Sequence, residues 1–201
     1  RLLRGINGTP DFLQVTNELL KGGLIDATSR YLLGWEKLLE EKSYKQMLDL
    51  EQYHSLAFFE VLSEAYESHD NLLYKREEGE DGNGSSSIYE MVVDILATLM
   101  TEPTEYRTGN EGWQLLVSTT LSLVLNLMGF SDFDSLVPYS GNGKLIGVCL
   151  NMLLMEHSTD PFLIHQVVAI LRHYAYDLPF AETLLHTPNS TEAVTTACLS
   201  L

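Results

Sequence analysis

The sequence is poor in cysteine and in basic residues. It contains two cysteines, Cys149 and Cys198, each within an apolar run, and twelve Lys and Arg side chains against 28 Asp and Glu. Two isolated cysteines do not form the disulfide framework of a small secreted domain, so we expect reduced, buried thiols in an intracellular protein, cytoplasmic or nuclear. A formal charge of −16 repels phosphate groups, which argues against nucleic acid and anionic membrane surfaces as partners.

Long apolar runs and catalytic motifs are also lacking. No uninterrupted apolar stretch approaches the ~20 residues that span a bilayer, so we expect no membrane segment. His157, His165 and His173 lie eight residues apart, but eight residues turn a helix about 80° beyond two full turns, so a shared metal is not expected. We therefore predict no enzyme, no cofactor, no metal and no small-molecule substrate.

Helical periodicity is what the chain has in abundance. Apolar residues recur three and four apart along most of it, strand-like alternation is absent, and an apolar content of 45% suffices for a core. Helices are predicted over residues 9–39 with a break at 21–23, and over 44–68, 87–100, 111–128, 144–157, 161–175 and from near 190. Thr9, Asp160 and Asn189 stand at expected N-cap positions. The fold class predicted is all-α.

One helix pattern occurs more than once. Leu24-Ile25 and Leu32-Leu33, separated by six residues, recur as Leu145-Ile146 and Leu153-Leu154, and a longer helix follows each time. Repeated helical units must stack to bury their apolar faces. We expect a single repeat region, 1–201, with units at about 10–70, 71–133 and 134–177 and a partial unit at 178–201, forming a fragment of a larger protein. The residues expected in the core include Leu32, Leu153, Leu171, Trp35 and Trp113.

The stretches GGLIDATSRYLL and DPFLIHQVVAILRHYAYDLPFAETLL resemble the second and third helices of armadillo repeats. The resemblance implies a right-handed α-solenoid whose longer helices line a concave face. In armadillo importers, an asparagine and a tryptophan four residues earlier hold extended peptides on that face. The asparagine position corresponds here to Glu64, Asn126 and His173, and the tryptophan position to Glu60, Ser122 and Ala169. Of these, Asn126 keeps the family's residue.

The function expected is a noncatalytic scaffold for protein–protein interaction. A peptide or helix of another protein is expected to bind the concave face, and a basic segment suits it. The expected site comprises Glu60, Glu64, Ser122, Asn126 and His173. The strong negative charge of the chain favours such a partner. The alternative is a structural or regulatory helical-repeat segment of a large multidomain enzyme, such as a ubiquitin-ligase scaffold.

A polar stretch, EEGEDGNGSSS, interrupts the second unit. The positions equivalent to Asn126 are 62 and then 47 residues apart, so the second unit has surplus residues, and a flexible acidic insertion at 77–87 accounts for them. A calcium loop is the alternative, because Asp81, Asn83 and Glu90 fit EF-hand positions. However, the first ligand position is Gly79 and the apolar eighth position is Ser86, which favours the insertion.

Overall fold

In the computed structural model, the described residues are 9–29, 51–64, 72, 87–101, 111–130, 142–154, 160–176 and 178–200. Every regular element in these ranges is an α-helix, which confirms the predicted all-α class. The helices are α2 (Pro10–Lys21), α3 (Leu24–Ser29), α6 (Glu51–Leu62), α8 (Ile88–Thr101), α10 (Glu111–Phe130), α12 (Asn142–Leu154), α13 (Pro161–Tyr176), α14 (Leu178–His186) and α15 (Ser190–Ser200).

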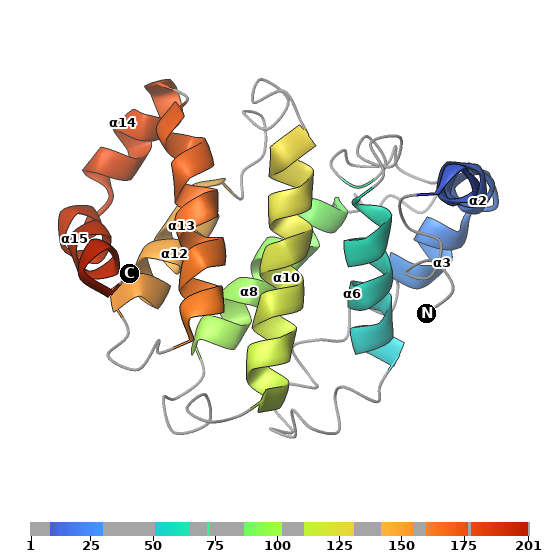
Figure 1. Ribbon diagram of the computed structural model, residues 1–201, viewed down its shortest axis with the longest axis horizontal. Coiled ribbons are helices and arrows are strands. Elements are labelled where there is room, and N and C mark those ends of the chain that lie inside the picture. Colours follow the sequence, from blue (N-terminus) through green and yellow to red (C-terminus); the bar gives the residue numbers. More distant parts are fainter. Residues whose placement is uncertain are drawn as a thin grey trace, which may run out of the picture.

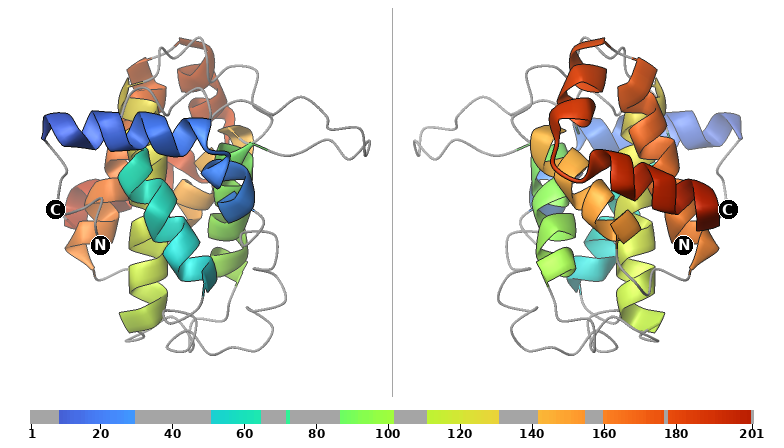
Figure 2. Two further views of the ribbon diagram at one scale, coloured as in Figure 1. Left: turned by 90° about the vertical axis from the view of Figure 1, so that its right-hand side faces the viewer. Right: turned by 90° about the vertical axis from the view of Figure 1, so that its left-hand side faces the viewer.

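The central helices form two layers. Helices α6, α10 and α13 stand side by side and run in the same direction, and we call them the front layer (Figure 1). Helices α8 and α12 form the back layer behind α10 and α13, as the side views show (Figure 2). Helix α10 packs against α6, α8 and α13, and α12 packs against α8, α13 and α15. Among the described helices, α10 therefore has neighbours at its two sides and behind it, and none lies in front of it (Figure 1).

One apolar core lies between the layers. Its members include residues with no exposed surface from each central helix, such as Phe59, Leu96, Leu121, Leu145 and Ile170. The predicted core residues Leu153 and Leu171 are 5% and 6% exposed, which confirms their assignment. Trp113 is also buried, as predicted, and its Nε1 donates a hydrogen bond of 3.1 Å to the carbonyl of Leu99, which joins α10 to α8. Leu32 and Trp35 lie outside the described residues.

The repeated helix pattern does not produce equivalent burial in its two copies. Leu145 is fully buried within the core, whereas Leu24, at the same place in the pattern, is 37% exposed. Among the described helices, α2 has its main contacts with α3. The break between the two helices falls where it was predicted, at Gly23, whose φ of 68° suits glycine. The neighbours of a helix, more than its own sequence, decide how deeply the pattern is buried.

Three helix starts show how local sequence sets the boundaries. Asp160 Oδ1 accepts a hydrogen bond of 2.9 Å from the Phe162 N–H, which confirms the predicted cap of α13. Thr9 is the N-cap residue of α2, but its side chain makes no capping hydrogen bond. Asn189 precedes α15 with a φ of 64°, a left-handed conformation that asparagine tolerates.

Helix α8 begins with a reciprocal capping box. The Ser87 N–H donates to Glu90 Oε2 and the Glu90 N–H donates to Ser87 Oγ, both at 3.1 Å. Ser87 is 2% exposed, so the last residue assigned to the polar insertion belongs to the packed start of α8. The rest of the insertion, 77–86, lies outside the described residues.

Two helix boundaries differ from the prediction. Helix α6 ends at Leu62 and is followed by a turn at Ser63 and Glu64. The prediction that Glu64 lies on this helix is therefore wrong. Helix α14 was not predicted as a helix, because it is short and contains Pro179. Proline is tolerated in the first turn of a helix, where its missing N–H has no intrahelical acceptor, and Pro179 is the second residue of α14.

Candidate functional site

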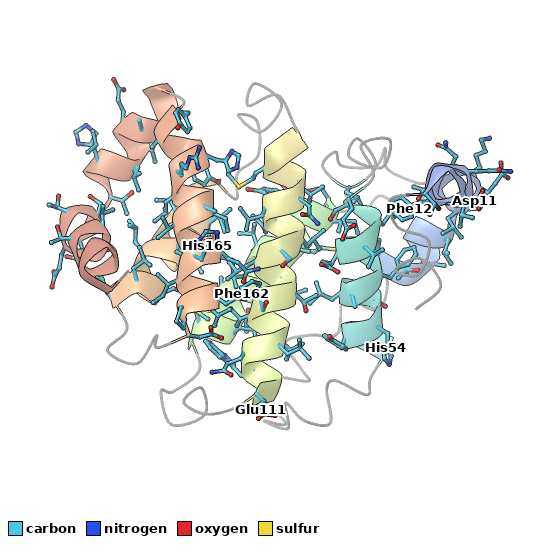
Figure 3. All side chains as sticks on the ribbon, viewed as in Figure 1. Asp11, Phe12, His54, Glu111, Phe162 and His165 are labelled. Atoms are coloured by element: carbon cyan, nitrogen blue, oxygen red, sulfur yellow. The ribbon has the colours of Figure 1, made fainter. Side chains whose placement is uncertain are left out.

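The front layer presents a narrow outward stripe on each of its helices. On α10, most positions are buried except those spaced three and four apart along one side. We call the outward residues of the three helices the front face: Ala57 and Glu60 on α6; Leu115, Ser118, Ser122 and Asn126 on α10; and Phe162, His165, Ala169 and His173 on α13. Figure 3 shows Phe162 and His165 on α13, on the side that carries the front face.

Asn126 bridges α10 to α6. Its Nδ2 donates to the main-chain carbonyl of Glu60 at 3.3 Å and to Ser63 Oγ at 3.0 Å. Ser63 Oγ in turn donates to the same Glu60 carbonyl at 2.6 Å. The sequence-predicted residues Glu60 and Asn126 are thus brought together, and the amide nitrogen of Asn126 is used in holding the two helices. Its carbonyl oxygen takes no part in these bonds.

Gln166 forms a second bridge, from α13 to α10. Its Nε2 donates to Ser122 Oγ at 2.7 Å and to the main-chain carbonyl of Ser118 at 3.2 Å. Gln166 is 4% exposed, and its carbonyl oxygen Oε1 is buried without a hydrogen-bond donor. A buried acceptor of this kind costs about 1 to 3 kcal/mol if it stays unsatisfied. The predicted site residue Ser122 is therefore an acceptor for Gln166.

The two predicted glutamates lie at the end of α6. Glu60 is half-buried within the last turn of the helix, and Glu64 is half-buried in the turn that follows, where its N–H donates to the Val61 carbonyl at 3.3 Å. Both therefore belong to one end of the front layer, near the Asn126 bridge.

His173 is the predicted site residue on α13, two turns beyond Gln166. Partial burial, and then the adjacent positive charge of Arg172, hold the pKa of His173 below its usual 6.5. Its imidazole is therefore uncharged at neutral pH and does not offset the glutamates. The Arg172 guanidinium lies 5.7 Å from the ring centre of Tyr176, a cation–π arrangement on the exposed end of α13.

Among the described residues, the titratable groups with the largest pKa shifts lie in the core behind α13. Tyr89 of α8 and Tyr174 of α13 are buried with their hydroxyl oxygens 3.5 Å apart. Burial raises the pKa of Tyr89 to about 12 and raises that of Tyr174 further. Burial also raises the pKa of the Cys149 thiol to about 12. A protonated, enclosed thiol is a poor nucleophile, so these groups offer no accessible chemistry.

Metal-ligand clusters are not found in the described part of the chain. No group of three or more His, Cys, Asp or Glu side chains there has the geometry to hold a metal ion. His165 is exposed and His173 half-buried, while His157 and the proposed calcium ligands at 79–84 lie outside the described residues. Glu90, the last ligand of the calcium alternative, uses its carboxylate in the cap of α8.

A search of the described helices for a membrane span finds none that is both long and apolar enough. Comparison of the chain with protein-family models, with curated proteins and with solved structures finds no match.

Sequence reasoning missed Gln166, although a signal for it exists. Leu163, Val167 and Ile170 mark the buried side of α13, and Gln166 falls on that side at the spacing of three and four residues. A polar amide on the core-facing side of a helix needs partners from a neighbouring helix. This argument predicts a hydrogen-bonded bridge from α13 to a neighbouring helix, but it does not identify the partner residues.

Proposed function

We propose that this protein is a noncatalytic helical-repeat scaffold that binds a segment of another protein on the front face. One observation supports it above the others: the five residues predicted for the site, Glu60, Glu64, Ser122, Asn126 and His173, all belong to the same layer of three helices or to the turn at its end. They come from three separate stretches of the sequence. A single face assembled from three parallel helices is suited to an extended or helical ligand.

Charge supports the choice of a basic partner. The chain has a formal charge of −16, and Glu60 and Glu64 add carboxylates at one end of the front face. A negative surface steers basic segments toward it and lowers the chance of association with acidic proteins. Part of the binding free energy is then electrostatic and is screened by salt over about 8 to 10 Å at physiological ionic strength.

The test first uses the chain to capture a partner protein in a pull-down. The binding site of that partner is then mapped. Its affinity is measured at low and high salt for the unchanged protein and for the variant Glu60→Lys with Glu64→Lys. The matched control reverses two exposed glutamates elsewhere, Glu18→Lys with Glu182→Lys, and so changes the net charge equally. We expect a loss of affinity and of salt dependence for the first variant alone. Equal losses in both variants would mean that net charge matters and the front face does not.

Asn126 and Ser122 are unsuitable for this test. Both take part in the bridges between helices, so their replacement alters the packing of the front layer as well as its surface. Glu60 accepts the hydrogen bond from Asn126 through its main-chain carbonyl, so this bond does not depend on the glutamate side chain.

A further inference from the structure

The seam between α10 and α13 combines an unsatisfied acceptor with exposed apolar side chains. Gln166 Oε1 is the acceptor, and Leu115 and Phe162 are 44% and 57% exposed. Leu115 lies one turn before Ser118, and Phe162 one turn before Gln166. Because α10 and α13 run in the same direction (Figure 1), the two apolar side chains lie toward the same end of the seam.

From this arrangement we propose that the α10/α13 seam binds an extended peptide segment that donates a main-chain N–H to Gln166 Oε1 and places an apolar side chain beside Phe162 and Leu115. The proposal rests on the proposed function, since it names the chemistry of the segment that the front face receives. It also assigns a binding role to Gln166, Leu115 and Phe162, which are not among the sequence-predicted site residues.

The geometry of the Gln166 amide favours this role. Two hydrogen bonds from Nε2 to α10 fix the plane of the amide, so Oε1, on the other side of the amide carbon, is directed away from the Ser118 and Ser122 acceptors. No other described side-chain oxygen in the front layer is both buried and without a donor. Phe162, which is 57% exposed, lies one turn before Gln166 on the same helix.

A neutral N–H is the donor that suits this oxygen. An ammonium or guanidinium group loses much of its hydration when it is pressed against a buried acceptor, whereas a main-chain N–H loses far less. Positive charge is instead accommodated at the end of the seam, where Glu111 begins α10 and Asp160 precedes α13. The segment that fits is therefore extended, with one apolar side chain and with lysine or arginine outside the buried contact.

The experiment uses a fluorescent, acetylated peptide with a central leucine, flanking serines and terminal lysines. In a series of such peptides, each main-chain nitrogen is methylated in turn, which removes one N–H at a time. Binding to the whole chain is measured by fluorescence anisotropy. We expect methylation at one position to weaken binding about tenfold, the factor that corresponds to about 1.4 kcal/mol.

The variant Gln166→Met removes the acceptor and keeps the length of the side chain. This variant should weaken binding of the unmethylated peptide about tenfold. Methylation should then have no further effect on its affinity, so that the effects of Gln166→Met and of methylation are not additive. Phe162→Ala, at an exposed position that does not endanger folding, should also weaken binding. Leu185→Ala is the matched control, because Leu185 is an apolar side chain that is 74% exposed on α14, outside the front face, and it should leave the affinity unchanged.

Several results would overturn the inference. If the peptide binds but neither methylation nor Gln166→Met affects it, the segment lies elsewhere on the front face; the proposed function survives and this site does not. No binding of any peptide in the series rejects the site for this class of ligand. A crystal structure with a water on Gln166 Oε1 that persists in the complex, or a dimer of the chain that covers the seam, also rejects it.

Discussion

The two seams of the front layer are each bridged by an amide side chain, but in different surroundings. Asn126, between α10 and α6, is half-buried, whereas Gln166, between α13 and α10, is 4% exposed and leaves its oxygen without a donor. Each amide donates to one main-chain carbonyl and one serine hydroxyl. The same chemistry therefore serves as a structural contact in one seam and leaves an unused acceptor in the other.

The largest effect is expected in the core behind the α10/α13 seam. Replacement of Leu171 by alanine removes a side chain that is 6% exposed and leaves a cavity, so it should lower the free energy of unfolding by about 2 to 5 kcal/mol. The same replacement at Leu185, which is 74% exposed, should change it by less than about 0.5 kcal/mol. Urea unfolding of both variants measures the difference. Equal losses would show that the buried side of α13 is wrongly assigned.

Alkaline pH should weaken the same part of the molecule. Burial raises the pKa of Tyr89 from 10.0 to about 12 and that of Cys149 from 9.0 to about 12. The unfolded chain releases these protons at lower pH than the folded protein, so this stability is fully present below pH 9 and is lost as the pH rises toward 12. For Tyr89 alone the full loss, reached above the pKa of the folded protein, amounts to about 3 kcal/mol.

The measurement is urea unfolding at several pH values from about 8 to about 11, which begins below the unfolded-state pKa of both groups. The variant Tyr89→Phe has no proton to lose at this position and should show a shallower decline than the unchanged protein. An identical decline in the two proteins would mean that the Tyr89 hydroxyl is not buried in the folded state.

A smaller effect distinguishes the two amide bridges directly. Asn126→Leu removes two hydrogen bonds and should cost about 1 to 2 kcal/mol. Gln166→Met also removes two, but it eliminates the unsatisfied Oε1 as well, so its net cost should stay below about 1 kcal/mol. Thermal or urea unfolding of the pair gives the comparison. A larger loss at Gln166 than at Asn126 would indicate that Oε1 is satisfied in solution, for example by water.

The helices were predictable because their signals are local. Apolar spacing placed most of them to within a few residues, and the Asp160 cap fixed the start of α13. The pair Ser87 and Glu90 also carries the spacing of a capping box, a signal that was present and not used. Helix α14 was missed because a short helix with a proline near its start has little periodicity to detect.

The contacts between helices were harder to predict. Asn126 was selected as a ligand-binding residue, but sequence alone does not show that its amide nitrogen is engaged by Glu60 and Ser63, more than sixty residues away. Gln166 was overlooked for the same reason, since its partners Ser118 and Ser122 are on another helix. The repeated pattern likewise does not distinguish the exposed Leu24 from the buried Leu145, because burial depends on which helices surround each copy.

The central claim is that a partner binds the front face, and site-specific photo-crosslinking tests it most directly. A benzophenone amino acid replaces either Leu115, exposed on α10 of the front layer, or Asn151, exposed on α12 of the back layer. The chain is then irradiated with the partner it captures, and the products are identified by mass spectrometry. We expect crosslinks to the partner from position 115 and none from position 151. Crosslinks from position 151 alone would contradict it.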